Sequence, residues 1–440
     1  MDAIDTLVVG AGVAGLAAAR LLTRAGQRVV VLEGRDRIGG RTFSDRSGGH
    51  VTDRGASWIH GIDDSPVAAA ARAFGMPMVE FTVGGYQPDS RPLTYFDDAG
   101  RRLSAEEVRQ YASDIRALNA ALVEVIAAAA PDATYADVVD RALAAQGWDA
   151  ERAARVREYN DRRAQEQYGV AMTGLGAHGL DDDTVNGDEV VFPRGYDELA
   201  RNFAEGVDVR LSHVVSGVHW SPEGVTVQTD RGAFTAAAAV ITVPVGVLQA
   251  GDVVIEPELP ETHRRALGLL RMNAFEKVVL RFPERFWEPG VYGIRQLGAE
   301  GEWWHSWYDL GRIHDEPALL TFAAGPAAVA TREWADEEIV ASTLAQLRRL
   351  YGDAMPEPES AVVTRWQDDP FSRGSYAYML PGSVGPDHDA LATPIEGVLH
   401  IAGEATWGDD PATVPGAMLS GHRAAQNVLR REIPVSDLWA

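Results

Sequence analysis

The chain has 440 residues, of which 46% are hydrophobic and 24% are charged, as is typical of a globular protein of two to three domains. The 40 lysines and arginines against 64 aspartates and glutamates give a net charge of -24, which repels nucleic acid and anionic lipid and attracts small cations. Because there is no cysteine, disulfides, thiolate metal sites, cysteine nucleophiles and a thioether bond to a cofactor are all excluded.

No targeting segment is predicted. The chain opens with Met1 to Asp5 without a basic region, and no apolar run reaches the roughly 18 residues of a membrane span. We therefore expect a cytoplasmic protein with neither membrane nor nucleic acid as a partner. No metal-ligand spacing and no nucleophile-elbow motif is present, so no metal site is predicted.

The N-terminal residues predict a β-α-β unit. An apolar strand from Ile4 to Val9 leads through a glycine turn into an Ala/Leu-rich helix that runs through Ala25 and stops at Gly26. A second strand follows from Arg28 to Leu32.

The turn of this unit has the spacing of a dinucleotide-binding loop, Gly10-Ala11-Gly12-Val13-Ala14-Gly15. The three glycines permit a tight turn, close approach to a pyrophosphate and close packing of helix on strand. Glu33 ends the second strand, where its carboxylate can accept hydrogen bonds from a ribose diol. NAD and FAD are both compatible with this pattern.

Further elements follow from periodicity and capping signals. They are, in chain order, a helix from Pro66 to Phe74 capped by Ser65, a mostly helical segment over 104–163 that opens with a Ser104–Glu107 capping box and restarts near Thr134, an antiparallel meander from Val207 to Val243, a strand from Lys277 to Phe282, a helix over 335–351, a strand from Val398 to Ala402, and a helix from Gly416 to Leu429.

The segment after Glu33 separates the two dinucleotides. Gly34 to Arg41 contains three glycines and three arginines suited to a second pass along a pyrophosphate, for which a nicotinamide enzyme has no use. This N-terminus resembles that of the flavin amine oxidase superfamily, which includes monoamine oxidases, polyamine oxidases and histone lysine demethylases.

The resemblance covers essentially the whole chain, because further family motifs occur in the expected order. They are Gly55 to Gly61, Thr242 to Leu248, Lys277 with Phe286-Trp287, Gly374-Ser375-Tyr376, His400 to Thr406, and Pro411 to Ala417.

The resemblance implies an α/β fold. A Rossmann-like FAD-binding domain of the glutathione-reductase type would carry an inserted α+β substrate domain with a mixed sheet. Because the flavin motifs occur at both ends of the chain, we expect residues 1–75, 190–260 and 385–440 in the FAD-binding domain, and 76–189 and 261–384 in the substrate domain.

The resemblance also implies a set of cofactor-binding residues. They are Gly10, Gly12, Ala14, Gly15, Glu33, Arg35, Gly40, Arg41, Gly55, Ala56, Ser57, Trp58, Val215, Trp366, Gly403, Glu404, Thr413 and Val414. Ser375 stands where monoamine oxidases place the cysteine that bonds the flavin, so the FAD is expected to be non-covalently bound.

Four residues are implied to act on the substrate. The resemblance places His60 beside the substrate amine, Lys277 next to a water near the flavin N5, and Tyr376 in one wall of an aromatic cage. Thr413 replaces the tyrosine of the second wall, which favours the polyamine oxidase and demethylase branch. The expected partners are a small cationic amine, most simply a polyamine, and O2.

Several alternatives stay open. The protein could be a monoamine or amino-acid oxidase, a flavin-dependent desaturase of a carbon skeleton, or a protein in which FAD is only structural. The absence of an arginine after Gly55 disfavours an amino-acid oxidase, and a demethylase would need a helical tower and an extra N-terminal domain. Without a second glycine fingerprint, an NAD(P)H site has no visible place. A monomer and a homodimer are equally compatible.

Acidic residues in one region are candidates for binding the distal amines of a polyamine at the channel mouth. They are Glu166, Asp181, Asp182, Asp183, Asp188 and Glu189. A solvated acidic loop is the alternative interpretation.

Overall fold

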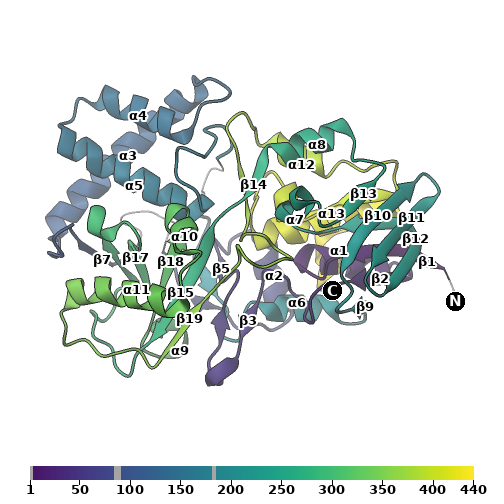
Figure 1. Ribbon diagram of the computed structural model, residues 1–440, viewed down its shortest axis with the longest axis horizontal. Helices are drawn as coiled ribbons and strands as arrows, with labels where there is room; N and C mark the ends of the chain where they lie inside the picture. Colours follow the sequence, from purple (N-terminus) through teal and green to yellow (C-terminus); the bar gives the residue numbers. More distant parts are fainter. Residues whose placement is uncertain (1–2, 84–90, 181–184) are drawn as a thin grey trace.

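The computed structural model describes residues 3–83, 91–180 and 185–440. Two sheets form separate halves of the molecule, and three helices stand beyond the second sheet (Figure 1). No helix among these described residues is both long enough and apolar enough to cross a membrane.

The first sheet has eight strands in the order β13-β10-β11-β12-β1-β2-β9, with β21 also paired to β12. Its strands are β1 (Ile4–Val9), β2 (Val29–Leu32), β9 (Asp208–Arg210), β10 (Val215–Ser221), β11 (Gly224–Thr229), β12 (Gly232–Ile241), β13 (Val254–Glu256) and β21 (Leu399–Ile401). The long β12 pairs antiparallel with β11 through its first half and parallel with β1 and β21 through its second half. This strand therefore joins the meander to the parallel core that contains both chain ends.

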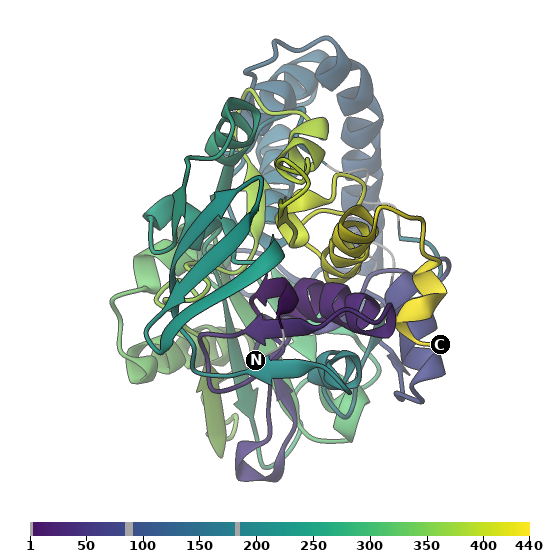
Figure 2. The same ribbon diagram turned by 90° about the vertical axis from the view of Figure 1, so that its right-hand side faces the viewer.

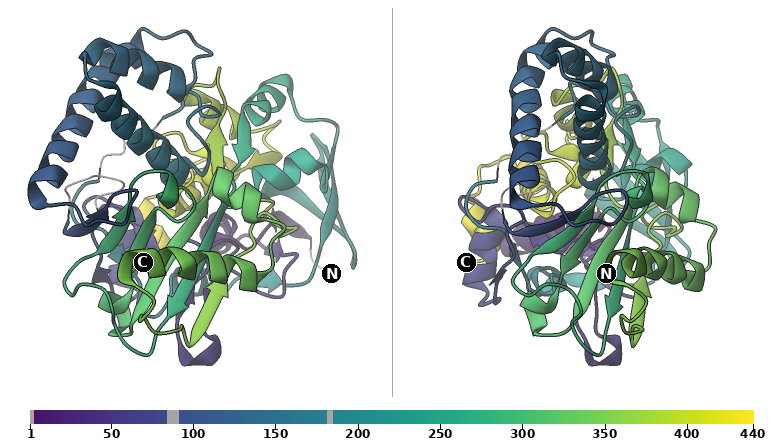
Figure 3. Two further views of the ribbon diagram at one scale, coloured as in Figure 1. Left: turned by 60° about the vertical axis from the view of Figure 1, so that its left-hand side comes forward. Right: turned by 90° about the vertical axis from the view of Figure 1, so that its left-hand side faces the viewer.

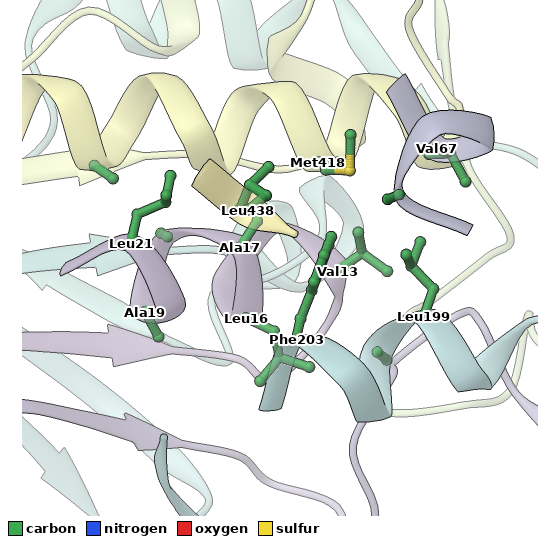
Figure 4. Close-up of a cluster of buried hydrophobic side chains, with 14 of the residues drawn as sticks. Val13, Leu16, Ala17, Ala19, Leu21, Val67, Leu199, Phe203, Met418 and Leu438 are labelled. Atoms are coloured by element: carbon green, nitrogen blue, oxygen red, sulfur yellow. The ribbon is translucent and has the colours of Figure 1, made fainter. Parts of the chain in front are cut away.

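Helices cover one face of this sheet. They are α1 (Val13–Arg24), α2 (Pro66–Ala73), α6 (Asp197–Ala204) and α13 (Val414–Leu429). Figure 2 shows α1 lying against α13 beside the C-terminal segment. Figure 4 shows buried side chains of one cluster on both sides of α1, among them Leu16, Leu21, Phe203 and Met418. Helices α1 and α13 approach backbone to backbone, since a Cβ at Gly421 would lie 2.1 Å from the Ala14 oxygen. The N-terminal motif and the C-terminal helix thus share one core.

The other face of the first sheet carries shorter helices. They are α7 (Val245–Ala250), α8 (Glu261–Gly268) and α12 (Pro386–Leu391), and the two-stranded ladder of β14 (Leu270–Met272) with β20 (Ala377–Met379) lies beside them. Leu270, Ala377 and Met379 are buried in the same cluster as Leu7 and Val9. Residues from the middle of the chain therefore complete the core around the N-terminal strand.

The second sheet has six strands in the order β19-β15-β18-β17-β16-β7. They are β7 (Leu93–Phe96), β15 (Phe275–Arg281), β16 (Gly293–Gln296), β17 (Ser306–Asp309), β18 (Ala318–Ala324) and β19 (Ser360–Val363). Only the β16–β7 pair is parallel, so the sheet is mixed. Helices α9 (Gly311–His314), α10 (Pro326–Thr331) and α11 (Asp336–Tyr351) belong to the same half.

Three long helices form the remaining layer. Figure 3 shows α3 (Ala105–Ala127), α4 (Tyr135–Gln146) and α5 (Ala150–Tyr168) standing together at the end of the molecule beyond the second sheet. Their caps are those the sequence predicts, with capping boxes at Ser104 and Thr134. The helical segment extends to Tyr168, where Gly169 adopts the left-handed conformation that ends it.

The fold class is confirmed, and one predicted element is wrong. The segment Val207–Val243 is not a single meander, because β9 pairs parallel with β2 and only β10 to β12 form the antiparallel part. Helix α6 brings the chain back across the sheet before β9, and such a crossover produces a parallel pair. The domain boundaries stay a prediction, although the first sheet draws on 4–32, 208–256 and 399–401 and the second on 93–96 and 275–363.

Candidate active site

A cavity of about 1010 Å³ lies between the two sheets and is lined by residues from both. Its walls include almost every residue for which the resemblance implies contact with cofactor or substrate. Those lining it are Gly10, Gly12, Ala14, Glu33, Arg35, Gly40, Arg41, Gly55, Ala56, Ser57, Trp58, His60, Val215, Lys277, Trp366, Tyr376, Gly403, Glu404, Thr413 and Val414.

Gly15 is the exception, since it does not line the cavity. A Cβ at this position would lie 2.0 Å from the Gly10 oxygen, so the glycine lets helix α1 pack directly on the end of β1. Its role in the structure is the close helix–strand packing of the motif, whereas Gly12 and Ala14 face the cavity.

The N-terminus of α1 opens onto this cavity. No side chain caps the helix at Gly12, and a Cβ there would meet no atom within 4 Å. The first amide groups of a helix lack intrahelical acceptors and carry a partial positive charge, so they favour an anion. This end of the cavity fits the pyrophosphate of a dinucleotide.

Glu33 lies beside the same helix end. Its side chain is buried, and its carboxylate accepts hydrogen bonds from the Ala11 amide at 2.7 Å and the Arg35 amide at 2.9 Å. Each carboxylate oxygen can accept a further bond, so the group is held in place and can still bind a ribose diol.

The two implied cofactor arginines are already engaged with carboxylates. Arg35 pairs with Asp369 at 2.7 Å and bonds to the Ser372 hydroxyl at 2.8 Å, while Arg41 pairs with Glu404 at 2.7 Å. Burial lowers the pKa of Arg35, and its Nε has no hydrogen-bond partner among the described residues. A buried guanidinium with an unused donor on the cavity wall fits a phosphate ligand, so the residues present fit a bound FAD.

Lys277 lies at the middle of the cavity wall. The side chain points from β15 to the loop that follows β4 (Thr52–Asp53), where the ammonium donates to the Asp53 and Gly55 carbonyls and to the Ser57 hydroxyl. Burial lowers the pKa of Lys277 to about 8, an effect that the charge of Asp53 partly opposes. Burial also raises the pKa of Asp53 to about 6. The cavity thus contains a buried ammonium group whose pKa lies well below that of a free lysine.

The amino-acid composition also distinguishes Lys277. Lys277 is the only lysine among 440 residues, and every other basic side chain apart from histidine is arginine. Lysine and arginine are not interchangeable, because a buried ammonium loses its proton near neutral pH far more readily than a guanidinium does. The one lysine of the chain thus stands at a buried position on the cavity wall, where this difference from arginine matters.

Aromatic rings line the cavity around Lys277. Phe275 lies two residues earlier on the same face of β15, and Phe322 is the cross-strand neighbour of Lys277 on β18. The rings of Phe275 and Phe322 are 4.7 Å apart, those of Phe275 and Tyr376 are 5.6 Å apart, and those of Tyr308 and Trp58 are 6.0 Å apart. The period-2 alternation of β15 could have revealed Phe275, but Phe322 and Tyr308 depend on strand pairing.

Tyr376 and Thr413 both face the cavity, as the resemblance implies. Tyr376 is anchored by its amide, which donates to Asn273, and its hydroxyl lies 3.4 Å from the Glu166 carbonyl. Thr413 is the N-cap of α13, which begins at Val414 rather than at the predicted Gly416, and its hydroxyl accepts from the Gly416 amide. Capping explains why a threonine suits this position.

Glu166 is a buried carboxylate on the cavity wall. The Tyr308 hydroxyl donates to it at 2.6 Å, and His305 Nε2 lies 3.1 Å away. Burial raises the pKa of Glu166, while Arg295 and the hydroxyl groups of Ser306 and Tyr308 act in the opposite direction. An approaching cation would favour the ionised carboxylate further.

Two of the other acidic candidates, Glu189 and Asp188, are paired with groups of the protein. Glu189 is fully buried, with its carboxylate bonded to His60 and to the Val83 amide. Asp188 is exposed and pairs with Arg91 at 3.2 Å. The predicted carboxylates at 181–183 lie outside the described residues. Of the six, only Glu166 is described as lining the cavity, because α5 directs it inward.

Comparison with known proteins supports this assignment. A sequence profile described as flavin containing amine oxidoreductase matches residues 13–429. The chain belongs to this family, and FAD is its cofactor. Probable polyamine oxidase 4 of Arabidopsis thaliana is 32% identical over 440 residues, which covers 97% of this chain and 87% of that protein.

Other relatives carry a different name. Lysine-specific histone demethylase 1 homolog 1 of Oryza sativa subsp. japonica is 32% identical over 451 residues, covering 97% of this chain but 52% of that protein. The chain therefore spans about half the length of such relatives. Among solved structures, a putrescine oxidase bound to putrescine has a TM-score of 0.80 at 24% identity, over 98% of this chain and 100% of that chain. This likeness concerns the fold alone.

Proposed function

We propose that this protein is an FAD-dependent oxidase of polyamines that uses O2 as the electron acceptor. The observation that carries the proposal is that one cavity combines three features. The N-terminus of α1 and Glu33 lie at one part of its wall, and Lys277 lies in the middle. Aromatic rings and the buried carboxylate of Glu166 line another part. The polyamine oxidase relatives support the same substrate class.

Each part of the cavity has a role in this proposal. When bound, FAD accepts a hydride from the carbon next to the amine nitrogen, and the imine product is hydrolysed to an aldehyde and an amine. Trp58, Tyr376 and the neighbouring rings exclude water and hold the uncharged reacting amine. Glu166 binds a distal ammonium of the same substrate, which orients the chain along the cavity.

Lys277 serves the reaction with oxygen. Transfer of electrons to O2 develops negative charge, and a buried, fixed cation stabilises this charge more than it would in water. The three acceptors of the ammonium hold it in place, so little reorganisation is needed as the charge develops.

We expect the rate of reoxidation by oxygen to fall as the pH rises through about 8, the pKa of Lys277. Below this pH the side chain is protonated and stabilises the developing anion, and above it the charge is lost. Because Lys277 is the only lysine, selective ¹³C labelling of lysine gives a single side-chain signal, whose titration reports this pKa directly. If the rate of reoxidation stays constant across the pKa of Lys277 measured by NMR, the charge of Lys277 does not assist the reaction with oxygen.

Glu166→Gln should weaken selection for polyamines. Loss of a charge-assisted contact of about 1.5–3 kcal/mol corresponds to a fall of roughly 10- to 150-fold in kcat/KM for spermine or spermidine, with little change for a monoamine of similar length. Steady-state kinetics on both substrates provide the ratio. Glu158→Gln is a matched control, since Glu158 is half-buried on the same helix but does not line the cavity. An unchanged ratio in Glu166→Gln would show that another group binds the distal amine.

A panel of amines under anaerobic conditions tests the proposed function itself. Spermine, spermidine, putrescine, tyramine, lysine and a methylated-lysine peptide are each mixed with the FAD-bound protein, and only a substrate should bleach the visible flavin band. Bleaching by polyamines followed by hydrogen peroxide release in air is the expected result. Bleaching only by the peptide would favour the demethylase branch, and bleaching by none of them would contradict amine oxidation.

A further inference from the structure

His60 and Glu189 lie side by side at the ends of two neighbouring strands of a small sheet, and His60 lines the cavity. The strands are β5 (Trp58–Ile59), β8 (Val190–Val191) and β6 (Val79–Glu80), with β8 in the middle. Strands β5 and β8 are antiparallel, with Ile59 opposite Val190. One step further in this register brings His60, which follows β5, opposite Glu189, which precedes β8. Cross-strand neighbours of this kind hold their side chains within contact distance.

The contact between the two side chains is direct. His60 Nδ1 is hydrogen-bonded to Oε1 of Glu189, whose other oxygen accepts from the Val83 amide at 2.6 Å. The Glu189 amide donates to the Thr82 hydroxyl at 3.0 Å, so backbone and side chain are both fixed. Glu189 is 0% exposed, whereas the His60 side chain is 56% exposed and lines the cavity. A buried acid thus supports an imidazole that substrate can reach.

This arrangement determines which ring nitrogen carries the proton. A carboxylate that accepts from Nδ1–H selects that tautomer, makes Nε2 the basic nitrogen, and stabilises the imidazolium once it forms. Among the described residues of these strands and their loops, the other charged groups include Asp63, Asp64, Glu80 and Asp188. Arg91 is paired with Asp188 and lies close to Glu80, and Lys277 lies beyond the Trp58 ring. Glu189 is hydrogen-bonded to the imidazole, so the charge of this carboxylate acts on His60 at contact distance.

We propose that Glu189 is a positioning residue that raises the proton affinity of His60, so that His60 Nε2 removes the proton an ammonium substrate must lose before oxidation. The proposal rests on the proposed amine oxidation. In this step the substrate N–H bond breaks, its electron pair stays on the amine nitrogen, and an Nε2–H bond forms. The resulting imidazolium is balanced by the Glu189 carboxylate and returns the proton to solvent through its exposed edge.

The test compares the FAD-bound wild type with Glu189→Gln, using histidine labelled with ¹³C and ¹⁵N and His60→Asn to assign the His60 signal. We expect the pKa of His60 to fall by about 1–3 units in Glu189→Gln, because a buried opposite charge is lost. In kinetic assays, the acidic limb of the plot of kcat/KM against pH should shift to lower pH by the same amount as the pKa of His60. The value of kcat/KM should fall roughly 10²-fold. Glu80→Gln, which neutralises a carboxylate on the neighbouring strand, should change neither value.

The outcomes distinguish this inference from the proposed function. An unchanged pKa of His60 in Glu189→Gln would overturn the inference whatever the amine panel shows, because this readout needs no turnover. A lowered pKa with an unmoved kcat/KM profile would overturn the proton-accepting role while amine oxidation stands. If Glu189→Gln does not fold, the ¹⁵N shifts of neutral His60 in the wild type decide the question, since Nε2-protonated imidazole would contradict the proposal.

Discussion

Lys277→Met should slow reoxidation of the reduced protein by oxygen by about 10²–10³-fold, the contribution typical of one well-placed electrostatic group. The substitution removes the only lysine of the chain from a position where its ammonium contacts Asp53, Gly55 and Ser57 beside the cavity. Reduction by the amine should fall much less, because the uncharged amine develops no anionic charge as it is oxidised.

Stopped-flow measurement of the two half-reactions on wild type and Lys277→Met separates these effects. The rate of reduction by the amine in the variant is the internal control for its rate of reoxidation. Loss of the ammonium leaves two backbone carbonyls without their donor, so FAD content and thermal stability are measured on the same samples. The expected pattern is bound FAD, near-normal reduction and slow reoxidation. Equal slowing of both half-reactions would instead indicate a structural role for Lys277.

Glu33→Ala should weaken retention of FAD by roughly 10- to 150-fold, which corresponds to the loss of a charge-assisted acceptor of about 1.5–3 kcal/mol. The buried carboxylate also accepts hydrogen bonds from the Ala11 and Arg35 amides, so its removal should loosen the glycine loop before α1. The flavin content per protein after gel filtration, together with the FAD concentration needed to restore it, measures the effect.

Asp36→Ala provides the matched control, because Asp36 is an exposed carboxylate three residues away that does not line the cavity. It should retain FAD like the wild type. If Glu33→Ala also retains as much FAD as the wild type, Glu33 does not contribute to binding of the cofactor.

Local sequence was sufficient for the elements whose signals are short-range. The β-α-β unit, the caps at Ser65, Ser104 and Thr134, and the strand that carries Lys277 all follow from periodicity and capping. Gly10, Gly12, Glu33 and Lys277 can likewise be proposed from the sequence, because glycine spacing, strand ends and family motifs are written in consecutive residues. The fold brings these four together in one cavity.

The contacts between distant segments could not be predicted in this way. The prediction for β9 is wrong because its partner β2 lies far away in sequence, and the partner of a strand is decided by the path of the intervening chain. Phe322 meets Lys277 only through the β15–β18 register, and Arg35 is paired with Asp369 more than 300 residues away. The same holds for the acidic candidates Glu166, Asp188 and Glu189. Whether each carboxylate faces the cavity, water or His60 depends on how the chain buries it, which the local sequence does not show.

The sequence by itself therefore determined the β-α-β unit and its dinucleotide-binding loop, since these follow from local patterns with a physical reason. Its resemblance to a family supplied the class of fold, FAD and the position of Lys277. Only the tertiary structure decided which charges are buried and paired. Glu166 faces the cavity and Glu189 supports His60 because α5 and the β5–β8 register direct them there, and neither fact can be read from the acidic residues alone.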